Sequence, residues 1–271
     1  MWKKTVILSQ PLSTLHRHSY SINDKCVSFT DCGLTGIYKG LTMLPQSLTF
    51  TKTLPSYNGK YCYSVNMTAD GHLICGLRGG VEIWDTIDGK VKYSRNMTGR
   101  MYDMKQSGKH LYGAWKYFNQ LTVVRYDRRL NNREEITSIP YQTKEVSQID
   151  VRYGNIAVID YSNKLIKLYT IDGEFVKDVA LKGRDDPCGA RLLIDGCVLV
   201  SDYGAGSVTK YQTDSSGSVV WSCGQVQNPL GLDVDEWGLI YVAEDCKISV
   251  LSPKGRYSVY ETSPCSFHHT S

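Results

Sequence analysis

The 271-residue sequence carries little excess charge of either sign, no C-x-x-C pair and no long hydrophobic run. A formal net charge of +4 does not demand a nucleic-acid partner, although clustered cations can still create a basic face. No stretch approaches the roughly 20 apolar residues that span a bilayer, and the apolar run at the N-terminus is too short for a signal peptide. We therefore expect no membrane partner.

Nine cysteines without a C-x-x-C pair argue against a zinc site or a disulfide framework. Cys75 and Cys197 lie in apolar runs, where a thiol side chain packs as a small hydrophobic group. Free thiols are typical of a reducing compartment, so the sequence predicts a cytoplasmic protein.

Patterns of catalysis are scarce as well. The sequence has no Gly-x-Ser-x-Gly elbow and no phosphate-binding glycine loop. Of its six histidines, His72 and His110 each follow a turn glycine, and the other four lie near the chain ends. Because a zinc or general-base site needs convergent histidines, we expect no enzyme activity, no catalytic residues, no cofactor and no small-molecule substrate.

What the sequence does contain is a repeat. Each unit has four short apolar runs, and a turn with glycine follows the first run. These turn glycines recur at intervals of 37, 46, 42 and 42 residues, at Gly71, Gly108, Gly154, Gly196 and Gly238. Strands of four to six residues with turns at fixed offsets predict an all-β fold, and the lack of a 3.6-residue period predicts few helices.

A unit of four strands and about 42 residues is the size of one propeller blade. The 271 residues accommodate about six such units. The sequence therefore predicts a six-bladed β-propeller of four-stranded antiparallel blades over 21–262. Residues 1–20 are expected to form a tail or a closing strand, and 263–271 a tail; a degenerate first unit is expected at 26–52.

The last two units resemble NHL repeats. Residues 187–202 and 229–244 each begin with Pro-x-Gly, continue through an apolar strand and a glycine turn, and end in a strand that resembles Tyr-Val-Ala-Asp. The alternative is a WD40 propeller, because Trp84-Asp85 stands where that family places its dipeptide. The Trp-Asp pair occurs only once in this sequence, which favours the NHL resemblance.

Among NHL propellers, the repeats look most similar to the C-terminal domain of tripartite-motif ubiquitin ligases. In that family the propeller selects the target, while a RING domain performs the ubiquitin chemistry. This sequence shows no RING, B-box or coiled coil. The resemblance therefore implies a non-catalytic platform that binds a protein partner, as in the substrate-recognition part of such a ligase; it also implies single-stranded RNA as an alternative ligand.

The binding residues are expected in the loops between second and third strands and between consecutive units. Cations and aromatic residues are concentrated in these loops: Arg78, Arg100, Trp115, Lys116, Tyr117, Phe118, Tyr161, Lys164, Arg184 and Tyr203. Cations neutralise phosphates and aromatic rings stack on unpaired bases. The same residue types anchor protein interfaces, so the pattern leaves protein and single-stranded RNA open.

A third alternative is a metal-dependent propeller hydrolase or lyase. The expected inner strands carry Asn66, Asp103, Asp150 and Asp233, whose oxygens could bind a hard cation such as calcium. Such residues are also ordinary in a solvated channel, and we expect no functional metal site.

Overall fold

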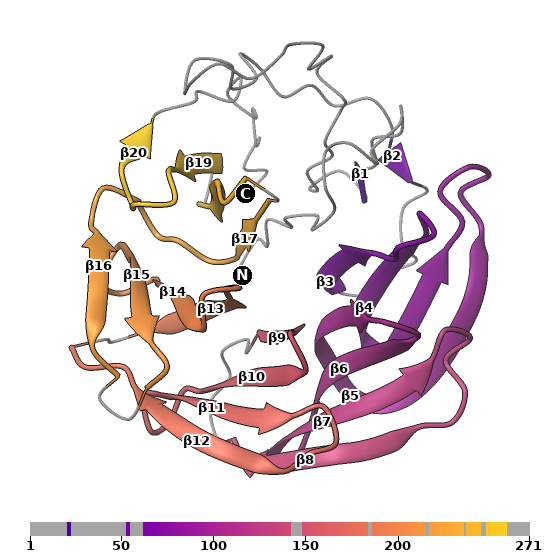
Figure 1. The fold of residues 1–271 in the computed structure, drawn as a ribbon. Coiled ribbons are helices and arrows are strands. Elements are labelled where there is room, and N and C mark those ends of the chain that lie inside the picture. The colour runs from indigo at the N-terminus through magenta and orange to yellow at the C-terminus, as the bar shows by residue number, and fades with distance from the viewer. Residues whose placement is uncertain are drawn as a thin grey trace, which may run out of the picture.

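A computed structural model describes residues 21–22, 53–54, 62–141, 148–183, 186–214, 217–235, 237–244 and 248–258. These residues form strands and turns. They contain no helix, and therefore no helix long and apolar enough to cross a membrane. A short parallel pair, β1 (Ser21–Ile22) and β2 (Thr53–Leu54), stands apart. The other strands form antiparallel sheets arranged about a common centre (Figure 1).

Three sheets have the predicted four strands in chain order. In each, the first strand lies nearest the centre and the fourth at the perimeter (Figure 1). Their strands are β9 (Ile149–Arg152), β10 (Asn155–Asp160), β11 (Leu165–Thr170) and β12 (Phe175–Ala180); β13 (Pro187–Leu192), β14 (Cys197–Asp202), β15 (Ser207–Gln212) and β16 (Val219–Cys223); and β17 (Leu232–Val234), β18 (Ile240–Ala243), β19 (Ile248–Leu251) and β20 (Tyr257–Ser258).

The fourth sheet has six strands. They are β3 (Cys62–Met67), β4 (Leu73–Trp84), β5 (Val91–Ser107), β6 (His110–Tyr117), β7 (Gln120–Asp127) and β8 (Glu134–Pro140). A straight strand of the length of β4 would span roughly 40 Å. However, the Thr86 hydroxyl donates a 2.6 Å hydrogen bond to the Gly71 carbonyl, so β4 folds back on itself.

Strand β5 belongs to two repeat units. Its first half pairs with β4, placing Asn96 opposite Gly80, and its second half pairs with β6, placing Arg100 opposite Lys116. The first half is largely exposed and the second half is buried over 101–104, so the strand passes from an outer to an inner position. The six-stranded sheet therefore combines the second and third predicted units.

The prediction of six separate blades needs correction. The described residues form four propeller sheets rather than six blades, because β5 continues from one unit into the next without a loop to separate them. The unit predicted at 26–52 lies outside the described residues, as do the tails at 1–20 and 263–271. The all-β propeller with four-stranded antiparallel blades is confirmed.

The repeat is also visible in the turns. The five turn glycines all have positive φ, between 57° and 82°. At the ends of β10, β14 and β18, buried carboxylates recur every 42 residues at Asp160, Asp202 and Glu244. Asp202 accepts a 2.7 Å hydrogen bond from the Ala205 N–H, and Glu244 a 2.8 Å bond from the Gln227 N–H. These acids tie down loops on one face of the propeller.

The hydrophobic core lies between neighbouring sheets. Ile139 of β8, Ile149 of β9 and Val158 of β10 belong to one buried cluster, which joins the six-stranded sheet to its neighbour. Equivalent clusters join the other sheets. Cys75 is buried as expected, whereas Cys197 at the start of β14 is partly exposed.

Candidate partner-binding face

Three of the predicted site residues form one row across the six-stranded sheet. Arg78 of β4 pairs with Arg100 of β5, which pairs with Lys116 of β6. Residues directly opposite each other on adjacent strands project to the same side of a sheet, and like charges placed so repel one another. The fold therefore gathers three cations, from the middle of β4, the middle of β5 and the end of β6, which we call the cation row.

Tyrosine rings lie beneath this row. The Lys116 ammonium is 4.8 Å from the centroid of the Tyr141 ring and 6.0 Å from that of Tyr102, and the Arg100 guanidinium is 5.9 Å from Tyr63. The rings of Tyr63 and Tyr102 meet edge to face at 5.3 Å. Cation–π attraction of this kind holds the two cations in place against the rings.

The charges of the row influence one another. Burial, and next the charge of Arg100, lower the pKa of Lys116. Arg100 is held in its charged form, because a hydrogen bond with the Tyr102 side chain raises its pKa. Both effects indicate that Lys116 sits in an electropositive, partly desolvated environment that favours an anion.

We expect the Lys116 ammonium to titrate below the ordinary lysine pKa of 10.5, so that its contribution to binding an anion is present below its folded pKa and is lost as pH rises through it. NMR observation of the lysine side chain across alkaline pH measures this midpoint. Arg100→Gln removes the neighbouring charge and should move the midpoint upward. A wild-type midpoint at or above 10.5 would contradict the proposed environment.

The hairpin between β6 and β7 presents a second group on the opposite side of the strand. The Trp115 and Tyr117 rings stack with centroids 5.4 Å apart and planes 7° apart, and Phe118 contacts Tyr117 at 4.3 Å. Phe118 is 77% exposed and Tyr117 is 38% exposed. The Arg133 guanidinium covers the Trp115 ring at 4.5 Å. We call these three rings the aromatic hairpin.

The remaining predicted residues are more dispersed. Lys164 lies 3.9 Å from the centroid of the Tyr161 ring, in the β10–β11 turn, and Tyr161 packs against the cluster that contains Tyr102 and Tyr141. Tyr203 occupies the equivalent turn after β14, where its N–H donates to the Asp186 carbonyl. Arg184 lies outside the described residues.

Sequence analysis missed the rings that support the cations. Tyr63 and Tyr102 lie within strands, where no binding residue was predicted. Tyr141 directly follows β8 and lies at the start of a predicted loop, 141–144, but it was not among the predicted binding residues. The alternation of Arg100 and Tyr102 along β5 is the available signal. It places both side chains on one face of the strand, as strand periodicity requires.

The first strand of each unit carries a polar residue at an equivalent position. The residues four or five places before each turn glycine are Asn66, Asp103, Asp150, Arg191 and Asp233. In the described residues these side chains bind neighbouring strands: Asp103 accepts from the Ile149 N–H at 3.1 Å, and Asp150 from the Leu192 N–H at 2.8 Å. The predicted channel acids therefore link adjacent sheets.

Among these five described residues Arg191 is the cation, and it is 1% exposed. Its guanidinium donates a 2.7 Å hydrogen bond to Asp150 and also pairs with Asp233. Burial on its own would lower the pKa of Arg191, but the carboxylates of Asp150, Asp233 and Asp103 outweigh it and raise that pKa. The guanidinium thus stays charged inside the propeller.

The fold and this arrangement define a β-propeller. No family model matches the sequence, and no curated protein matches it. The NHL and tripartite-motif resemblance therefore stays a prediction.

Solved structures provide the comparison. A protein of unknown function from Bacteroides caccae is 17% identical, with a TM-score of 0.59 over 75% of this chain and 82% of that one. Virginiamycin B lyase from Staphylococcus aureus is 14% identical, with a TM-score of 0.58 over 73% and 68%. The WD40 β-propeller domain of Doa1 is 16% identical, with a TM-score of 0.54 over 73% and 67%. These likenesses show the fold.

Proposed function

We propose that this propeller is a non-catalytic interaction platform that binds an acidic segment of a partner protein. The observation that carries the proposal is the cation row, in which Arg78, Arg100 and Lys116 are placed in register above tyrosine rings. The repulsion within such a row is a cost to the fold, and an acidic ligand offsets it.

The aromatic hairpin supports a protein partner. Tyr, Trp and Arg side chains that already pack on one another are typical anchors of protein interfaces, because they bury a large area with little loss of side-chain freedom. Phe118 and Tyr117 are therefore expected to contact apolar side chains of the partner, next to its acidic residues.

Fluorescence anisotropy with two labelled peptide pools of equal length tests the proposal. One pool is rich in Glu and Tyr, and the other in Lys and Tyr. We expect the acidic pool to bind and the basic pool not to bind. Lys116→Ala and Arg100→Ala should each weaken binding about tenfold, the loss expected from one charge-assisted hydrogen bond.

Lys109→Ala is the matched control, because Lys109 is exposed at the β5–β6 turn, at the opposite end of the same strands. It should leave binding unchanged. Failure of the acidic pool to bind, or equal losses in the control, would reject the proposal. A single-stranded oligouridylate that binds more tightly than the acidic pool, with losses at Lys116 and Arg100, would replace a protein partner by RNA.

A further inference from the structure

A cavity of about 240 Å³ lies at the other end of the β5–β6 pairing from the cation row. On β5 the row lies at Arg100, opposite Lys116, whereas the cavity lies near the turn that places Ser107 opposite His110. Side chains from four inner strands line it, among them Asn66, Lys105, Gln106, Asp150, Arg152 and Arg191. The site is therefore separate from the proposed partner-binding face.

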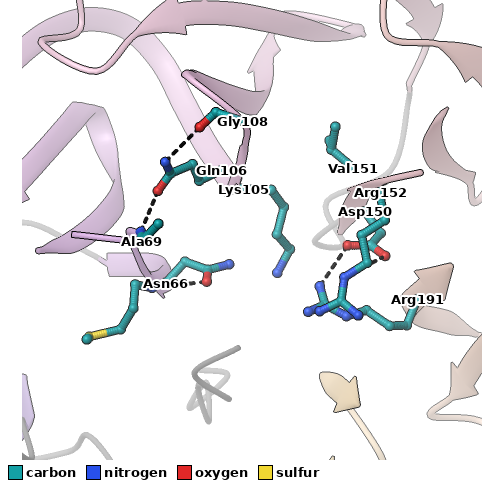
Figure 2. Close-up of a pocket in the computed structure, with 10 residues that line it drawn as sticks. Asn66, Ala69, Lys105, Gln106, Gly108, Asp150, Val151, Arg152 and Arg191 are labelled. Carbon is teal, nitrogen blue, oxygen red and sulfur yellow. Dashed lines mark hydrogen bonds and ion pairs between the residues drawn. The ribbon is translucent and has the colours of Figure 1, made fainter. Parts of the chain in front are cut away.

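The charges that line the cavity are mainly positive. Lys105, Arg152 and Arg191 are cationic, and Asp150 is the acidic residue among the lining side chains. Figure 2 shows Lys105 extending between Asn66 on one side and the group of Asp150, Arg152 and Arg191 on the other. The cations therefore face the cavity, while Asp103 and Asp233, their ion-pair partners, are not among the lining residues.

The acceptor atoms of the acids are largely occupied. Asp150 accepts from the Leu192 N–H at 2.8 Å through one oxygen and from Arg191 at 2.7 Å through the other. Asp103, the partner of Lys105, accepts from the N–H groups of Met104 and Ile149. Because backbone N–H groups and Arg191 take the short hydrogen bonds of these carboxylates, Lys105 and Arg152 make only longer ion pairs, at 3.5 to 3.9 Å.

The amides beside the cavity are occupied as well. Gln106 accepts from the Ala69 N–H at 2.7 Å and donates to the Gly108 carbonyl at 2.9 Å, as Figure 2 shows. Asn66 donates to the Met104 carbonyl at 3.0 Å. These contacts fix the wall in place and leave ligand recognition to the cations.

The donors of the cations are incompletely used. Lys105 approaches Asp103 only to 3.7 Å, and Arg152 approaches Asp150 to 3.9 Å and Asp233 to 3.5 Å. The Nε of Arg191 is buried and has no hydrogen-bond partner. A buried N–H group without an acceptor costs free energy, so Arg191 has a donor that the wall does not satisfy; the Asp233 Oδ2 acceptor is unsatisfied as well.

We propose that this cavity binds a small dianion, either a phosphate group or a dicarboxylate. Arg152 supplies a planar fork that matches two oxygens of either group, and Lys105 supplies a point charge from the other side of the cavity. The volume is below the roughly 300 Å³ at which sites for drug-sized ligands begin, which restricts the ligand to a small molecule or a single anionic group.

Isothermal titration calorimetry of the full chain with inorganic phosphate and, separately, malonate tests the site. We expect saturable binding of at least one, and the stronger of the two distinguishes phosphate from dicarboxylate. Lys105→Gln and Arg152→Gln should each weaken binding about tenfold. Lys90→Gln removes the same charge from an exposed turn and should change nothing, since Lys90 is 80% exposed.

No saturable heat from either anion up to about 10 mM would overturn the proposal, as would equal affinity in wild type and both cavity variants. NMR of the wild-type chain supplies a readout that does not depend on a variant that folds. Phosphate or malonate should shift the side-chain signals of Lys105 and Arg152. A shift confined to exposed lysines would identify surface adsorption and would also overturn the site.

Discussion

Replacing Arg191 with methionine is expected to lower the free energy of unfolding by about 4 kcal/mol, the loss typical of removing one partner from a buried ion pair. Arg191 is 1% exposed and pairs with Asp150 and Asp233, which are also buried. Methionine fills much of the same space but leaves Asp150 and Asp233 only their longer contacts with Arg152, at 3.9 and 3.5 Å. Because whole domains are stable by only about 5–15 kcal/mol, this change removes a large share of the total.

Urea unfolding followed by circular dichroism measures the loss. Arg125→Met is the matched control, because Arg125 also pairs with two carboxylates, Glu134 and Asp172, but those acids are exposed. Its expected cost is below about 1 kcal/mol. Equal costs at the two positions would show that Arg191 and its two carboxylates contribute no more to stability than an exposed ion pair.

A double-mutant cycle separates the charge effect from packing. In an Asp233→Asn background, Arg191→Met should cost less than in the wild type, since one of the stranded carboxylates is then neutral. An unchanged cost would assign the loss to the shape of the Arg191 side chain rather than to its charge.

The second large effect is expected at Gly99, where β5 passes from one repeat unit to the next. Gly99 has φ +109°, and a Cβ atom there would lie 2.4 Å from the Lys116 carbonyl oxygen and 3.0 Å from Nε1 of Trp115. Trp115 is itself held by a 2.9 Å hydrogen bond to the Thr98 carbonyl. Gly99→Ala should therefore cost about 3 kcal/mol through backbone strain and overlap.

Gly108→Ala is the comparison, because Gly108 has φ +57° with nothing within 4 Å of the added Cβ. Its cost should be about 1 kcal/mol, the ordinary penalty of a left-handed backbone for alanine. Gly99→Ala should also weaken binding of the acidic peptide pool, since it displaces the backbone of Lys116. Costs within about 0.5 kcal/mol of each other would contradict the close approach at Gly99.

The repeat was sufficient to predict the strands and their turns, because strand period and turn glycines are local properties of the chain. The blade count was less accessible: Arg78-Gly79-Gly80 and Thr98-Gly99 look like loops in the sequence, yet both segments lie inside strands, β4 and β5. These strands pair on either side of the glycines, Arg78 with Arg100 and Gly80 with Asn96. Pairing is decided by neighbours in other units, which local patterns do not contain.

The candidate site was predicted in part. Arg100 and Lys116 were selected as loop cations, but their common row depends on a register set across β4, β5 and β6. Arg191 was overlooked because a single arginine in an apolar strand is conspicuous only when the repeats are aligned and its counterparts are seen to be Asn and Asp. Its partners come from strands about 40 residues away on either side, so no local pattern reveals them.

The continuous course of β5 has a consequence for how such a chain can change its number of blades in evolution. Between β12 and β13, or between β16 and β17, the unit boundary falls in a connection, so a whole unit can be duplicated or deleted without cutting a strand. Between the second and third units the boundary falls inside β5, next to a glycine with no room for a side chain. Recombination at that point would break the hydrogen bonding of both units. We therefore expect the second and third units to be inherited together.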